Sequence, residues 1–200
     1  MNFAQFQHGR RISLRYFALL IAAWWLVVAP TKVSADTAQT DLSAADKLLR
    51  LAQKQFTNDI APSEEKLFRA AAKGEVADYQ NRNKTVDNDP TNAVAWSTNR
   101  RIRADRLVWL CTDPDASELV SFRGIQITGA RIDGTVDLGA SNLSFPIKVT
   151  QSAFTSDLIL ICSHLPSLDL SGTHVRAVEA KWMKVDASIF LEAGSQLKEW

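Results

Sequence analysis

The sequence predicts a mainly β fold: a short parallel β-helix of about three four-sided coils, preceded by an α-helical N-terminal region. Two observations predict it. From Ile125 onward, apolar residues recur as pairs separated by one residue, and the starts of these pairs advance by 10 or 11 positions. Between them lies a second series of pairs with a mostly small first member, and it keeps the same step.

The period sets the geometry of this repeat. Two inward side chains with one outward side chain between them form a very short strand. A new strand begins every five or six residues, so four strands close a coil of about 21 residues, and coils stack at about 4.8 Å. Two other β folds fit this repeat less well. A β-sandwich would have longer strands, and a left-handed hexapeptide β-helix would need a strict step of six residues, which the sequence lacks. The predicted interior comprises Ile127, Ile132, Leu138, Leu143, Val149, Phe154, Leu160, Leu165, Leu170 and Val175.

The same register sorts the outward residues onto four faces. The predicted stacks are Gln126 with Lys148, Asp169 and Phe190; Asp137 with Ile159 and Glu179; Arg131 with Ala153 and His174; and Asn142 with His164 and Lys184. His164 and His174 therefore fall on different faces, which argues against a shared metal ion. We find no pattern that predicts a catalytic site, a metal site or a cofactor.

Residues 1–35 have the pattern of an export signal. They hold four basic residues and no acid, an uncharged run of 14 residues from Tyr16 to Ala29, and small residues at Val33–Ala35. We expect cleavage after Ala35, with an uncleaved membrane anchor as the alternative. Gly9–Arg15 resembles a twin-arginine signal, although paired arginines also occur in signals of the general export route. The remaining chain has 19 basic and 22 acidic groups and so carries a charge of −3.

Residues 36–119 predict an α-helical region that caps the solenoid. Ser43 and Asp46 form a capping box for the first helix, and Pro62 opens a second helix whose apolar stripe reaches Tyr79. A third helix is predicted over Ala93–Thr112, ended by Asp113–Pro114. Residues 120–200 then form the β-helix. We expect either that this β-helix is truncated relative to a longer protein or that its end pairs with another surface.

The predicted third helix is basic. It carries Arg100, Arg101, Arg103 and Arg106, which suit contact with anionic lipid headgroups or an acidic partner. The alternative is a solvated face whose arginine stems cover apolar surface. Cys111 and Cys162 either form a disulfide after export or stay reduced and buried.

The repeat units resemble those of the pentapeptide-repeat proteins. The carriers are small-x-(Leu/Phe) units such as Ser141-Asn142-Leu143 and Ser152-Ala153-Phe154. Gly124–Gly134 and Glu64–Asp78 are also similar to a bacterial set with such repeats, whose members are labelled membrane-associated oxidoreductases. The resemblance covers about residues 60–200. It implies the right-handed four-sided β-helix, and no catalytic motif ties the activity label to residues of this chain.

Two functions follow from these features. The first is an exported, non-catalytic scaffold or interaction module in the periplasm or cell envelope, with an unidentified protein or an envelope surface as its partner. The alternative is the membrane-associated oxidoreductase that the resemblance implies. Membrane association would use the N-terminal segment, and self-association would use an uncapped C-terminal coil. The export signal and the mildly acidic body argue against a nucleic-acid partner or a DNA mimic.

Overall fold

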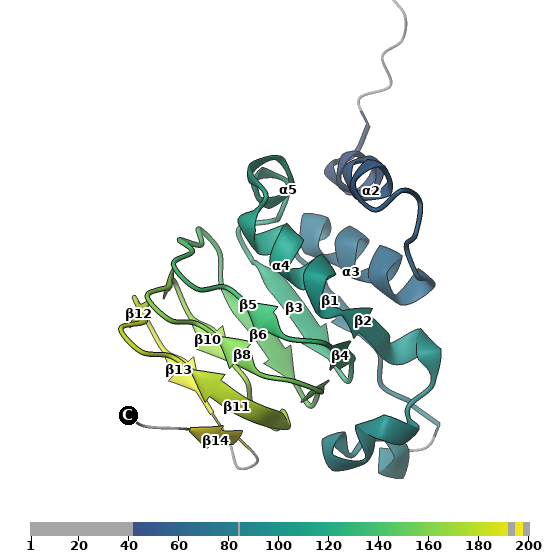
Figure 1. Cartoon of the computed structure of the whole chain (residues 1–200). Helices are drawn as coiled ribbons and strands as arrows, with labels where there is room; N and C mark the ends of the chain where they lie inside the picture. Colours follow the sequence, from purple (N-terminus) through teal and green to yellow (C-terminus); the bar gives the residue numbers. More distant parts are fainter. Residues whose placement is uncertain (1–41, 84, 192–194, 198–200) are drawn as a thin grey trace, which may run out of the picture. The chain divides into compact units, whose positions relative to one another are not determined.

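The computed structural model describes residues 42–83, 85–191 and 195–197, so the predicted export signal lies outside the described residues. A parallel β-solenoid of about three turns follows a small group of helices (Figure 1). The predicted mainly β solenoid is therefore confirmed. No helix among the described residues is long and apolar enough to cross a membrane.

The strands stack in four parallel sheets in the described part of the chain. The first sheet contains β1 (Val76–Asp78), β3 (Ile125–Thr128), β6 (Ile147–Thr150), β10 (Leu168–Asp169) and β13 (Ile189–Phe190). The second contains β5 (Val136–Asp137), β8 (Leu158–Ile159), β11 (Val175–Glu179) and β14 (Ser195–Leu197). The other two contain β2 (Arg101–Arg103), β4 (Arg131–Asp133) and β7 (Ala153–Phe154), and β9 (His164–Leu165) with β12 (Lys184–Val185).

The strand register agrees with the stacks predicted from the repeat. Lys148 lies opposite Gln126 on one side and Asp169 on the other, and Asp169 lies opposite Phe190. Lys148 Nζ is 2.9 Å from Asp169 Oδ2. Because the lysine is exposed, this pair contributes about 0–1 kcal/mol to stability. The other three predicted stacks also occur.

The solenoid interior is apolar, with small polar residues at the narrow positions. All ten residues of the predicted repeat core are buried. Ser152, Ser163 and Thr173 are buried as well, and their hydroxyls donate to backbone carbonyls of Thr150, Leu160 and Val149 at 2.7–2.8 Å. Small hydroxyl residues therefore leave room for the large side chains without leaving a buried polar group unpaired.

The first two helices begin where the sequence predicts. α2 (Ala44–Gln55) starts after Ser43, whose side chain accepts a hydrogen bond from the backbone N–H of Asp46 at 3.2 Å. α3 (Pro62–Lys73) ends at Gly74, which adopts a left-handed conformation with φ 69°. The prediction that the second helix extends to Tyr79 is wrong, because the left-handed residue turns the chain into strand β1.

The predicted third helix over residues 93–112 is wrong in its first half. The chain forms the 3₁₀ turns η1 (Thr85–Asn88), η2 (Pro90–Ala95) and η3 (Thr98–Arg100), and then strand β2. Only α4 (Ala104–Thr112) is α-helical, and the short α5 (Pro114–Glu118) follows it. The side chain of Ile102 is buried, and the arginines on either side of it are more exposed. This alternation of burial is typical of a strand with one face on the solenoid core.

Strands β1 and β2 add to the solenoid from the region that was expected only to cap it. β1 pairs with β3, with Ala77 opposite Ile127, and β2 pairs with β4, with Ile102 opposite Ile132. Ala77 and Ile102 are both fully buried. Residues before position 120 therefore supply a partial first rung, and α3 and α4 pack beside it (Figure 1).

Candidate functional site

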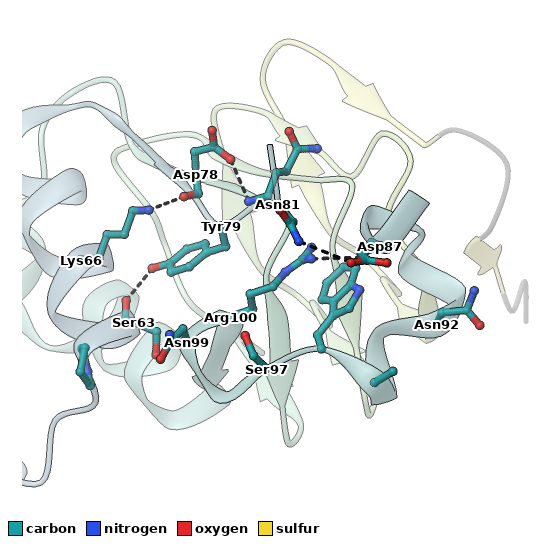
Figure 2. A pocket seen from close by; sticks show the side chains of 14 residues that line it. Ser63, Lys66, Asp78, Tyr79, Asn81, Asp87, Asn92, Ser97, Asn99 and Arg100 are labelled. Atoms are coloured by element: carbon teal, nitrogen blue, oxygen red, sulfur yellow. Dashed lines mark hydrogen bonds between the residues drawn. The ribbon is translucent and has the colours of Figure 1, made fainter. Parts of the chain in front are cut away.

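A cavity of about 870 Å³ lies where the start of α3, the end of β1 and the 3₁₀ segment meet (Figure 2). Its charged lining residues are Lys66 and Arg100, which are basic, and Asp78 and Asp87, which are acidic. Amide and hydroxyl side chains supply most of the remaining polar lining. The cavity thus combines polar groups with apolar surface, and its charged side chains sum to zero.

Arg100 is the most enclosed cation of this cavity, with 7 % of its surface exposed. Its Nε donates to the carbonyl of Gly129 at 2.8 Å, and its Nη1 donates to the carbonyl of Asp87 and the side-chain oxygen of Asn88, both at 3.1 Å. All three acceptors are neutral. Burial lowers the pKa of Arg100, and the nearby carboxylates of Asp87 and Asp78 oppose that shift.

The guanidinium of Arg100 stacks on Trp96. Its Cζ lies 3.5 Å from the centre of the indole ring, and Trp96 is itself buried. Arg100 Nη2 and Trp96 Nε1 are both buried and have no hydrogen-bond partner among the described residues. Leaving a buried donor unpaired costs about 1–3 kcal/mol, so this stacked pair can bind an acceptor group.

Backbone contacts position the pair against the solenoid. Gly129, which supplies the carbonyl for Arg100, has φ 71°, and a Cβ at this position would lie 2.6 Å from Gln80 Cγ. Only glycine therefore allows this close approach. On the opposite wall, the Tyr79 hydroxyl donates to the carbonyl of Ser63 at 2.5 Å, and Lys66 Nζ lies 4.8 Å from the Tyr79 ring centre (Figure 2). Burial raises the pKa of Tyr79, and Glu64 adds to the shift.

The four arginines predicted to contact an anionic surface do not share one exposed helix face. Arg101 is exposed, Arg100 lines the cavity, and Arg103 and Arg106 belong to an internal ion-pair network. The basis for an arginine-rich helix surface is therefore absent.

Glu64 is the centre of that network. Its carboxylate is fully buried, accepts hydrogen bonds from Arg103 Nε at 2.8 Å and from Arg106 Nε at 3.4 Å, and also accepts the N–H of Ala61 at 2.9 Å. Burial raises the pKa of Glu64, but the hydrogen bonds from Arg103 and from the backbone outweigh it, so the pKa lies below its usual 4.5. Asp59 completes the network with a contact of 2.5 Å to Arg103. These contacts join α3 to β2 and α4 and have a structural role.

The other predicted site residues form no shared centre. His164 Nε2 lies 2.7 Å from Asp186 Oδ1, a contact the sequence did not predict, and His174 stacks on Ala153 in a different sheet. Within the described ranges, no group of three or more His, Cys, Asp or Glu residues could hold a metal ion. Both cysteines are free; Cys111 is buried, which raises its pKa to about 12, and Cys162 is exposed, contrary to the expectation of two buried thiols.

The C-terminal rung is the second candidate site. Along the first sheet the inward residues Ile125, Ile147 and Leu168 are 0 %, 4 % and 2 % exposed, whereas Ile189 in the last strand is 45 % exposed. Trp182 and Phe190 on the same rung are also exposed. Among the described residues, none covers the apolar side chain of Ile189 at this rung.

Comparison with protein-family models, with curated proteins and with solved structures finds no significant match to the chain. The resemblance to pentapeptide-repeat proteins therefore rests on the repeat and on the solenoid that it forms.

Proposed function

We propose that the chain is an exported, non-catalytic scaffold whose C-terminal rung binds a second copy of the same chain. The scaffold is a right-handed β-helix with four-sided coils. Four parallel sheets and a separation of 21 or 22 residues between the stacked strands β3, β6, β10 and β13 of the first sheet support the coil shape. The right hand follows the strong preference of parallel crossover connections.

The observation that carries this proposal is the exposure of the solenoid interior at Ile189. A rung that the described residues leave uncovered exposes both apolar side chains and strand edges. In the described part of the chain, β12 and β13 each pair with a strand on one side only. An end of this kind favours a partner that brings both a strand edge and an apolar surface.

A second copy satisfies both requirements. Two identical rungs related by a two-fold axis place Ile189 of one copy near Ile189 of the other and bring equivalent strand edges together. Such a contact is self-complementary, and it pairs equivalent edge strands in antiparallel fashion, unlike the parallel pairing between the rungs of one chain. A partner of different sequence is the outcome that the experiment below distinguishes.

The test combines location and oligomeric state. The full chain is expressed in a bacterium, the cell is fractionated, and the mature N-terminus is sequenced; we expect export and cleavage after Ala35. Sedimentation velocity of the recovered protein should show a concentration-dependent dimer. A flavin, haem or metal absorption band in the same sample would instead support the membrane-associated oxidoreductase that the resemblance implies.

A matched pair of variants locates the contact. Ile189→Lys places a charge at the open interior and should shift the protein to monomers. Val76→Lys is the control, because Val76 lies in the opposite edge strand of the same sheet and is 49 % exposed. A wild-type protein that is monomeric throughout, or a dimer that only Val76→Lys disrupts, would contradict the proposal.

A further inference from the structure

We propose that the cavity beside α3 binds a small polar monocarboxylate through Arg100 and Trp96. This site is separate from the C-terminal rung, and the inference does not depend on the proposed self-association. It follows from three properties of the cavity: its unpaired groups, its charge and its lining.

The unpaired groups are both donors. Arg100 Nη2 and Trp96 Nε1 have no partner among the described residues, and both side chains line the cavity. The guanidinium carbon of Arg100 lies 3.5 Å from the centre of the Trp96 ring, so the two unpaired donors belong to adjacent, stacked side chains. Since a guanidinium and an indole can only donate, the group that completes this unit is an acceptor.

The buried positive charge of Arg100 favours an anion, although the charged side chains of the cavity as a whole sum to zero. The carboxylates of Asp78 and Asp87 are nearby, but the hydrogen bonds of Arg100 with described residues end on two carbonyls and one amide oxygen, all of them neutral. A cation that is 93 % buried with neutral partners is well suited to a carboxylate, which forms strong charge-assisted hydrogen bonds with arginine.

The lining favours a single negative charge and further polar groups on the ligand. Asp78 and Asp87 also line the cavity and would repel a dianion such as phosphate more strongly than a monoanion. Asn92, Ser97 and Asn99 can bond to a hydroxyl or amine of the ligand. The two unpaired donor atoms are covered, so the ligand reaches them after a rotamer change of the wall, which is common at binding sites.

Equilibrium dialysis of the full chain with radiolabelled lactate tests the site. We expect saturable binding that Arg100→Gln weakens about tenfold or more, since the charged donor is lost. Arg101→Gln is the matched control: it removes the same charge from the adjacent, exposed position and should leave binding unchanged. Acetate should compete with lactate better than inorganic phosphate does.

A second variant protects the test against misfolding. Circular dichroism shows whether each variant is folded. If Arg100→Gln is unfolded, the binding test uses Trp96→Phe instead, because this variant keeps an aromatic ring under Arg100 and removes the indole N–H. In the ¹⁵N-labelled chain, the indole signal that Trp96→Phe removes should shift with lactate. Absence of saturable lactate binding, equal binding by Arg100→Gln, or stronger competition by phosphate would each overturn the proposal.

Discussion

At the scale of single residues, burial decides what each arginine does. Arg100, Arg103 and Arg106 are close in the sequence, yet Arg100 donates to neutral oxygens and the other two contact Glu64. Arg106 also stacks on Phe56, with its Cζ 3.6 Å from the ring centre. A run of positive charge therefore becomes one cavity residue and one internal ion-pair network, with Arg101 alone left exposed.

The buried Glu64 network makes stability depend on pH. Because the pKa of Glu64 is lower in the folded chain than its usual 4.5, its contribution is complete above the unfolded pKa and is lost as the pH falls through the folded pKa. We expect the free energy of unfolding, measured by urea denaturation, to fall on acidification below about pH 5.

Substitutions at Glu64 and Glu65 distinguish the contribution of this network to stability from the general effect of acid. Glu64→Gln leaves Arg103 and Arg106 without their carboxylate and should cost about 3–5 kcal/mol at neutral pH. Glu65→Gln, which removes the acid of an exposed pair with Arg69, should cost less than about 1 kcal/mol. An acid-induced loss that is equally steep in wild type and Glu64→Gln would contradict the assignment.

At the scale of elements, the first strands of the solenoid lie before the start of the sequence repeat. The sequence predicted the strands after Ile125 because each interior position recurs on the next coil. Strands β1 and β2 occur once each, and a polar loop and 3₁₀ turns separate them, so periodicity gives no signal for them. The cavity could not be predicted from the sequence either, because its walls come from three separate segments that only the tertiary fold brings together.

The partial first rung predicts a strong effect at Ile102. Its side chain is fully buried against the solenoid, so Ile102→Ala should destabilise the chain by about 2–5 kcal/mol in urea denaturation. Val94→Ala shortens an aliphatic side chain that is largely exposed in η2 and should change stability by less than about 0.5 kcal/mol. Equal effects of the two substitutions would show that β2 does not cover the core.

At the scale of the whole molecule, the solenoid is a short stack with different ends. At one end α3 and α4 pack on the first rungs, and their buried side chains join the solenoid interior in one core. At the last described rung, Ile189 is 45 % exposed. The asymmetry explains why the two proposals concern different places: the cavity forms where helices meet the first rung, and the association surface forms at the last rung.

Both proposals depend on the alternation of inward and outward residues along the short strands. Leu160 and Ile159 test it: Ile159 is the last residue of β8, and Leu160 follows it directly with its side chain in the core. Leu160 is fully buried, whereas Ile159 lies on the outer face between Asp137 and Glu179. The same substitution, to lysine, should therefore have very different effects.

The decisive measurement is the free energy of unfolding of Leu160→Lys and Ile159→Lys beside that of the wild type. We expect Leu160→Lys to lose about 4 kcal/mol or more, or not to fold, because it places an unpaired charge in the core. Ile159→Lys, which lies between two acids, should stay within about 1 kcal/mol of the wild type. Similar stabilities for the two variants, or greater damage from Ile159→Lys, would contradict the register on which the solenoid is built.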